Sequence, residues 1–133
     1  MAEKKKFYNF CVLNNAVTKS GNAYVAATIK GTLCNVDQRE SDGKTIVTAN
    51  LPVSGRDKYL KTVLGDNIEV NEEGTVWVRV TMWENTAERF LKLLGDNEKL
   101  TLVVCGSIKT RTYEDREGNT RYSVELTVND FTL

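Results

Sequence analysis

The sequence predicts an all-β fold with one short helix, in which five strands close a Greek-key barrel. Three observations lead to this fold class. Most of the chain consists of short segments of alternating apolar and polar residues, separated by Gly, Asn and Asp. One apolar stripe with helical spacing precedes the last two of these segments. The 133 residues contain one proline and no low-complexity stretch, so we expect a single domain over 1–133.

The first half of the chain contains three alternating segments. Residues 7–13 (FYNFCVL) predict an opening strand, and residues 23–33 and 44–53 predict two more strands. A polar loop is expected over 35–43. Residues 54–74 are harder to place, although 57–64 are compatible with one or two helical turns.

A helix is predicted directly after the segment VWVRVTMW, residues 76–83. Asn85 is expected to cap its N-terminus, with Glu88 completing a capping box. Gly95 is expected to end it. The apolar stripe has the spacing i, i+3, i+4, i+7 and consists of Ala87, Phe90, Leu91 and Leu94. Because the helix is short and apolar on one side, we expect it to plug a sheet.

The last two alternating segments predict a long, protruding hairpin. Its arms cover 100–113 and 120–128, and the polar loop EDREGN (114–119) joins them. Basic side chains gather on this hairpin at Lys109, Arg111, Arg116 and Arg121. Strands, one helix before the last pair, and then a long hairpin form the order that is typical of a five-stranded OB-fold barrel.

The strand VWVRVTMW has an unusual second face. Successive side chains on a strand point to opposite faces, so Trp77, Arg79 and Trp83 share the face opposite the valines. One interpretation is structural: the aromatic rings fill a second core layer or an oligomer interface. The other is a stacking platform for the bases of a single nucleic-acid strand. Tyr113 shares a face with Lys109 and Arg111, and this second aromatic and basic cluster favours the platform.

Composition removes several classes of function. The chain has no histidine and no GxxxxGK[ST] loop, so we expect no enzymatic activity and no cofactor. Its three cysteines, Cys11, Cys34 and Cys105, lack CxxC spacing and predict free thiols rather than disulfides or a metal site. No segment resembles a signal peptide or a membrane span, so a cytoplasmic protein is expected. Net charge is zero, so charge alone indicates no nucleic-acid partner.

Two other features have a plain and a functional interpretation. Tyr59 lies among Arg56, Lys58 and Lys61, where it is either an amphipathic surface residue or an additional stacking residue. The run Lys4–Lys6 is expected to be a solvated tail, with occasional contact to phosphates as the alternative.

Two stretches of the second half carry a family resemblance. WVRVTMWENTAERFLKLL and GSIKTRTYEDREGNTRYSVELTV resemble the bacterial single-stranded DNA-binding proteins of the replication type. The matching pattern is Trp-x-Arg-Val, an aromatic, Ala-Glu opening a helix, Gly-x-(Ile/Leu)-x-Thr-Arg-x-(Trp/Tyr)-x-Asp, a Gly turn, and Arg-Tyr. Upstream, IKGTLCNVD and DGKTIVTANLPVS match more loosely, so the resemblance covers about residues 27–128.

The resemblance implies a fold and a function. Members of that family coat single-stranded DNA as OB-fold subunits, usually in homotetramers, and we expect a homo-oligomer here, a tetramer or a dimer. The function expected is sequence-independent binding of single-stranded DNA in replication, recombination or repair. The family's stacking aromatics fall on Trp77, Trp83 and Tyr113, and its phosphate contacts on Arg79 and Arg111. With the basic hairpin arms and Tyr59, the expected nucleic-acid-binding residues are Trp77, Arg79, Trp83, Lys109, Arg111, Tyr113, Arg121 and Tyr59.

The chain also departs from the family pattern. Residues 1–22 are an extension without a counterpart, and 54–75 lacks an expected tryptophan, which leaves Tyr59 as a weak substitute. After NDFTL there is no glycine-rich linker and no acidic tail ending in phenylalanine. We therefore expect no tail-mediated recruitment of replication proteins, in either a tailless relative or a truncated chain. The alternative function is an OB-fold protein–protein interaction module that uses the aromatic face.

Overall fold

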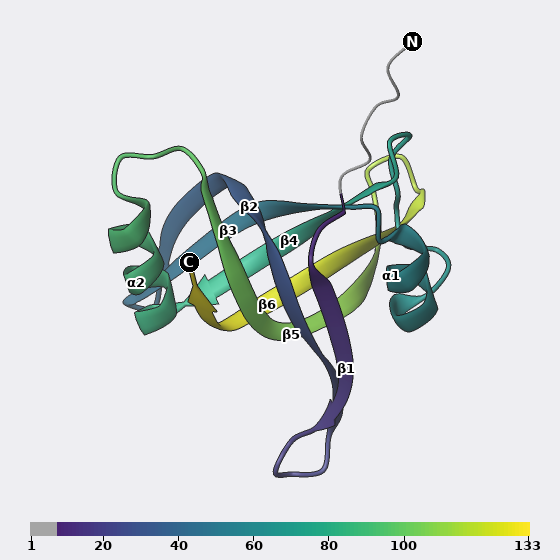
Figure 1. Cartoon of the computed structure of the whole chain (residues 1–133), viewed down its shortest axis with the longest axis horizontal. Helices are drawn as coiled ribbons and strands as arrows, with labels where there is room; N and C mark the ends of the chain where they lie inside the picture. The colour runs from purple at the N-terminus through teal and green to yellow at the C-terminus, as the bar shows by residue number, and fades with distance from the viewer. Residues whose placement is uncertain (1–7) are drawn as a thin grey trace.

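A computed structural model describes residues 8–133, and the Lys4–Lys6 run lies outside the described residues. Its elements are β1 (Cys11–Val17), β2 (Ala23–Ser41), β3 (Lys44–Ser54), α1 (Asp57–Leu64), β4 (Thr75–Trp83), α2 (Glu84–Leu94), β5 (Leu100–Glu114) and β6 (Thr120–Thr132). The helices α1 and α2 lie at opposite ends of the sheet, and the turn between β1 and β2 projects away from it (Figure 1).

The strands form one sheet in the order β1-β2-β3-β4-β6-β5, and an additional pairing of β2 with β5 closes five of them on themselves. The pairing of β4 with β6 is parallel, and the other described pairings are antiparallel. Closure removes the exposed edges of these five strands. This topology confirms the predicted OB-fold, to which β1 adds a sixth strand beside β2.

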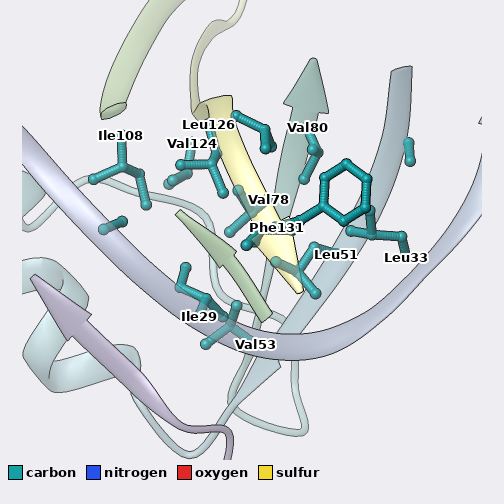
Figure 2. Close-up of a cluster of buried hydrophobic side chains, with 14 of the residues drawn as sticks. Ile29, Leu33, Leu51, Val53, Val78, Val80, Ile108, Val124, Leu126 and Phe131 are labelled. Atoms are coloured by element: carbon teal, nitrogen blue, oxygen red, sulfur yellow. The ribbon is translucent and has the colours of Figure 1, made fainter. Parts of the chain in front are cut away.

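The barrel interior holds the apolar half of each alternating strand. Val78 and Val80 of β4 lie beside Val124 and Leu126 of β6 in register, and Figure 2 shows these side chains within one buried cluster. Phe90 of α2 is fully buried and packs edge-on against Phe131, with ring centroids 6.1 Å apart. The helix α2 therefore plugs the barrel as predicted, through the ring of Phe90 and the other apolar residues of its stripe.

The predicted loop over 35–43 is wrong, because β2 continues to Ser41. Residues 37–41 pair with 44–48 of β3, and only Asp42 and Gly43 form the turn, both with positive φ. Two positive φ angles are typical of a tight hairpin turn. The outer part of this hairpin is exposed, so it has no apolar alternation to signal a strand.

The opening strand is shifted from the predicted 7–13 to Cys11–Val17. It pairs with 23–29 of β2, and the buried side chain of Asn9 fixes its start. Asn9 donates to the Lys30 carbonyl at 2.9 Å and accepts from the Ser54 backbone N–H at 2.7 Å. The second half of β1 lies beyond the barrel core. It therefore contains polar residues such as Asn14 and Asn15 in place of the apolar alternation that predicts a strand.

Two helices are present rather than one, since the segment compatible with helical turns forms α1. The expected Asn85 cap is wrong: Trp83 occupies the N-cap position, no side chain caps the helix, and Glu84 has a positive φ. Gly95 ends α2 as predicted, with its N–H bonded to the Leu91 carbonyl at 3.1 Å. Neither helix has the length and hydropathy that crossing a membrane would require.

The three cysteines are free thiols, as predicted. Cys11 is buried on the inner side of β1, and burial raises the pKa of its thiol to about 11. The thiol therefore stays protonated at neutral pH, which makes it a small apolar core residue rather than a nucleophile.

Candidate nucleic-acid interface

The outer face of β4 carries the residues that the sequence singled out. Val76, Val78 and Val80 are essentially inaccessible, whereas Trp77 and Trp83 are 49% and 48% exposed. Arg79 is also exposed. Large apolar side chains are usually covered, so two half-exposed indoles on one strand indicate a binding surface. The structure thus places Trp77, Arg79 and Trp83 on the face that the alternation predicted.

The second predicted cluster lies on the outer face of β5. Lys109 and Arg111 are exposed, and Tyr113 is 40% exposed. Beyond Ile108, β5 pairs only with β6, and β6 joins β4 only from Val124 onward. The arms that carry this cluster therefore extend past the closed part of the barrel, as expected for a protruding hairpin.

Strand β6 joins the two clusters into one surface. Its Glu125 is the Cα partner of Arg79 on β4 and of Lys109 on β5. Partners in register point to the same face, and neighbouring strands lie about 4.8 Å apart. Arg79 and Lys109 are thus separated by one strand, or about 10 Å. We call the outer side of these three strands the β4-β6-β5 face, defined by Trp77, Arg79, Trp83, Lys109, Arg111 and Tyr113.

The cations of the β4-β6-β5 face are available to a ligand. Within residues 8–133, Arg79, Lys109 and Arg111 have no carboxylate oxygen within 4.0 Å. Glu125 is half-buried between two of them without forming an ion pair. Unpaired cations beside exposed aromatic rings can bind phosphates while bases stack on the rings.

Trp83 also supports the fold on this face. Its partner across the β3–β4 ladder is Ile46, which is only 2% exposed although it lies outside the barrel core cluster. An isoleucine on the outer face needs a cover, and side chains directly opposite each other across a ladder pack together, so we expect the Trp83 indole to contribute to this cover. Trp83 therefore combines an exposed ring with a packing role, which Trp77 opposite Pro52 does not share.

Arg121 is brought to the edge of the face but is engaged elsewhere. Its guanidinium pairs with the carboxylates of Glu69 and, at 3.5 Å, of Asp115. The hydrogen bond and charge of Glu69 raise the pKa of Arg121. Backbone N–H groups of Asn119 and Glu117 at the hairpin tip help lower the pKa of Asp115. In this arrangement Arg121 ties the base of the hairpin tip to the segment before β4.

Tyr59 lies away from the other predicted residues. Its hydroxyl accepts the Leu13 N–H at 2.8 Å and donates to the Leu13 carbonyl at 3.2 Å. Both groups belong to the outer edge of β1, which would otherwise present unpaired backbone groups. Tyr59 thus covers a strand edge, and this contact depends on a hydrogen bond across 46 residues that single-sequence patterns do not signal.

Two residues of the site were not found from the sequence. Glu125 and Asn50 are both Cα partners of Arg79, on opposite sides of β4. Alternation alone indicates that Glu125 points outward with its neighbours on β6, but nothing local signals that β6 lies beside β4. The parallel register between these strands is what places a carboxylate at the centre of a basic surface.

Three solved structures with a similar fold are described as single-stranded DNA-binding proteins. The small single-stranded DNA-binding protein from Streptomyces coelicolor aligns with a TM-score of 0.58 and 16% identity, over 82% of this chain and 93% of its own. The mitochondrial protein Rim1 from S. cerevisiae aligns with a TM-score of 0.53 and 13% identity, over 83% and 94%. At these identities the likeness concerns the fold.

A third similar structure is a deletion mutant of the single-stranded DNA-binding protein from Thermus aquaticus. It aligns with a TM-score of 0.52 and 20% identity, over 87% of this chain and 43% of that one. A comparison with curated proteins gives no significant match.

A family model settles what these likenesses leave open. The model described as the single-strand binding protein family matches residues 24–133, from the start of β2 to the last residue. This range includes the 27–128 over which the sequence resembles the family, and it leaves out β1. With the closed five-stranded barrel and its exposed aromatic and basic face, the match shows that this chain belongs to the single-strand binding protein family.

Proposed function

We propose that the protein binds single-stranded DNA without regard to sequence, through the β4-β6-β5 face. The observation that carries the proposal is the register of β6, which joins two aromatic and basic clusters into one surface. Trp77, Trp83 and Tyr113 offer rings to bases, and each stacked base contributes about 1–3 kcal/mol. Arg79, Lys109 and Arg111 hold phosphates, which carry no sequence information. Such binding serves DNA replication, recombination or repair.

The proposed mechanism needs no catalytic group. The single-strand binding protein family is a non-enzymatic family of DNA-binding proteins, and we propose that this chain acts only by binding. In OB-folds, nucleic acid lies across the second and third barrel strands and the loops of the first and last barrel hairpins. Here those elements are β3, β4, the 42–43 turn and the 115–119 loop, and the exposed rings and cations gather on β4 and beside the 115–119 loop.

We also propose that the protein works as a cytoplasmic homo-oligomer. The support is the exposed outer side of β1 and of the residue before it, where Val12 is 38% and Phe10 54% exposed. Beside them on the same sheet face lie the small side chains of Thr28 and Cys105. A patch of apolar and small residues suits a second copy of the chain. Light scattering of wild type and of Phe10→Lys tests this, because a shared interface at this patch predicts a lower mass for the variant.

Fluorescence titration with an unstructured oligothymidylate tests the DNA proposal. Bases stacked on Trp77 and Trp83 should quench indole emission, and the same quenching is expected with a mixed-sequence strand of equal length. Three or four phosphate contacts predict that log K falls with log salt at a slope of about −2 to −3. A slope near zero would rule out phosphate contacts on this face.

The alternative of a protein–protein interaction module uses the same exposed rings, since aromatic residues and arginine are enriched in interfaces. The titration separates the two functions. If neither oligothymidylate nor a mixed-sequence strand alters the emission or binds at low salt, the β4-β6-β5 face serves a protein partner instead.

A further inference from the structure

We propose that Tyr24, at the base of the β1–β2 hairpin, is an additional base-stacking residue that extends the DNA path across β5 onto this hairpin. The inference rests on the proposed function and deepens it by naming a binding subsite outside the expected residues. It starts from the row of side chains that crosses the β4-β6-β5 face.

Tyr24 continues this row by one strand. Arg79 pairs with Glu125, and Glu125 pairs with Lys109. The last pair of the β2–β5 ladder is Val25 with Ile108, both directed to the core, so Tyr24 and Lys109 next to them point outward. Tyr24 therefore lies beside Lys109, one strand further from Arg79, or about 14 Å from it across three strand spacings.

The side chain of Tyr24 is half-buried, and its nearest neighbours on the outer face are small. Its partner on β1 is Ala16, and Ala26 is the next outward residue on β2. Both side chains are methyl groups, which cover little of a phenol ring. Within residues 8–133 the Tyr24 hydroxyl has no side-chain or backbone hydrogen-bond partner. A partly exposed ring beside an unpaired lysine is again an aromatic and basic pair, here formed across two strands rather than within β5 as by Arg111 and Tyr113.

The charge of the β1–β2 hairpin suits an additional contact with DNA beyond the usual OB-fold elements. Residues 8–29 contain no Asp or Glu, and Lys19 is their one charged residue. The β2–β3 hairpin has a net charge of −1, because its exposed carboxylates Asp37, Glu40 and Asp42 outnumber its exposed cations Arg39 and Lys44. Carboxylates repel a phosphate backbone at short range. The β1–β2 hairpin projects from the barrel near the point where β2 and β5 separate (Figure 1), which is where Tyr24 and Lys109 lie.

The test compares four proteins with oligothymidylates spanning about 4 to 16 nucleotides, the range of OB-fold site sizes. Tyr24→Leu keeps an apolar side chain but removes the ring, and Tyr24→Phe keeps the ring. Val17→Ala is the matched control, because Val17 is exposed on the same hairpin but points to the opposite face. Melting temperature and light-scattering mass are measured for each protein.

We expect Tyr24→Leu to bind the longest oligothymidylate at least about fivefold more weakly than wild type, and the shortest one almost equally. Tyr24→Phe and Val17→Ala should match wild type at every length, with melting and mass unchanged. Equal affinity of Tyr24→Leu and wild type at all lengths would overturn the inference, as would a Tyr24→Phe variant as weak as Tyr24→Leu. Failure of wild type to bind any oligothymidylate would instead refute the proposed function itself.

Discussion

The inner and outer faces of β4 belong to the same backbone but serve different purposes, since one is buried in the core and the other is exposed to solvent. On the inner face, Val78 and Val80 are fully buried and meet Val124 and Leu126 of β6. On the outer face, Trp77 is half exposed and lies opposite Pro52 of β3. Burial of apolar area stabilises the inner face, at about 25 cal/mol per Å². The outer face gains little from folding, which leaves its rings and cations free for a ligand.

This comparison teaches that stability and binding should respond to different residues of the same strands. A substitution on the inner face should lower the free energy of unfolding and leave the intrinsic affinity of the folded protein nearly unchanged. A substitution on the outer face should do the reverse. Four variants, ordered by expected effect, test how complete this separation is.

The largest effect is expected for Leu126→Ala on the inner side of β6. Leu126 is fully buried, so its truncation should leave a cavity and lower the free energy of unfolding by about 2–5 kcal/mol. Urea unfolding measures this loss. Thr127→Ala is the matched control, because Thr127 is the next residue and is exposed on the outer face. A loss of similar size for both variants would show that the outer face also contributes to the free energy of unfolding.

Trp77→Ala should produce the second-largest effect, and on binding rather than on stability. Removal of one stacking ring should reduce the free energy of DNA binding by about 1–3 kcal/mol. Titration with an oligothymidylate and a melting curve on the same sample separate the two quantities. If Trp77→Ala instead unfolds the protein or dissociates its oligomer at unchanged intrinsic affinity, the indole belongs to a packing surface and the assignment of the face is wrong.

Arg79→Ala should have a smaller effect that is uniform across sequences. The loss of one phosphate contact should reduce the magnitude of the salt slope by about 0.7 and weaken binding at low salt. Binding to homopolymers and to mixed-sequence strands should fall by the same factor, because phosphates do not report the base. A loss confined to one homopolymer would reveal direct base contact by Arg79.

The smallest effect is expected for Glu125→Gln, and it has the opposite sign. Glu125 lies between Arg79 and Lys109 and should repel phosphates bound there. Its neutralisation should strengthen DNA binding about two- to threefold at low salt, since partly exposed charge interactions amount to about 0.5 kcal/mol. Glu88→Gln on the exposed side of α2 is the control and should leave the affinity unchanged. Weaker binding by Glu125→Gln would mean that the carboxylate orients a cation for DNA.

Prediction from sequence succeeded where one strand or one helix contains its own signal. Alternation over 76–83 assigned the inward and outward side chains of this part of β4, and the apolar stripe located α2. It failed where the chain leaves the core. The outer parts of β1 and β2 are exposed on both sides, so no apolar period marks them as strands, and pairing within each hairpin decides their conformation.

The functional residues show the same difference between what one strand signals by itself and what depends on contacts between distant segments. Sequence identified Trp77, Arg79 and Trp83 as one cluster and Lys109, Arg111 and Tyr113 as another, because each cluster lies on one strand. The different situations of Arg121 and Tyr59 were not visible in the sequence. Ion pairs with Glu69 and Asp115 engage Arg121, and a hydrogen bond to Leu13 engages Tyr59, across distances of 6 to 52 residues.

The sequence by itself determined which side chains of each strand face the barrel and which face solvent, because strand geometry requires alternation regardless of the partner. Only the tertiary structure decided that the outward sides of β4 and β5 form one surface. That outcome depends on β6, whose parallel pairing with β4 and antiparallel pairing with β5 bring Arg79 and Lys109 to either side of Glu125. Register between distant strands is set by the packing of the whole barrel, which no local stretch of sequence records.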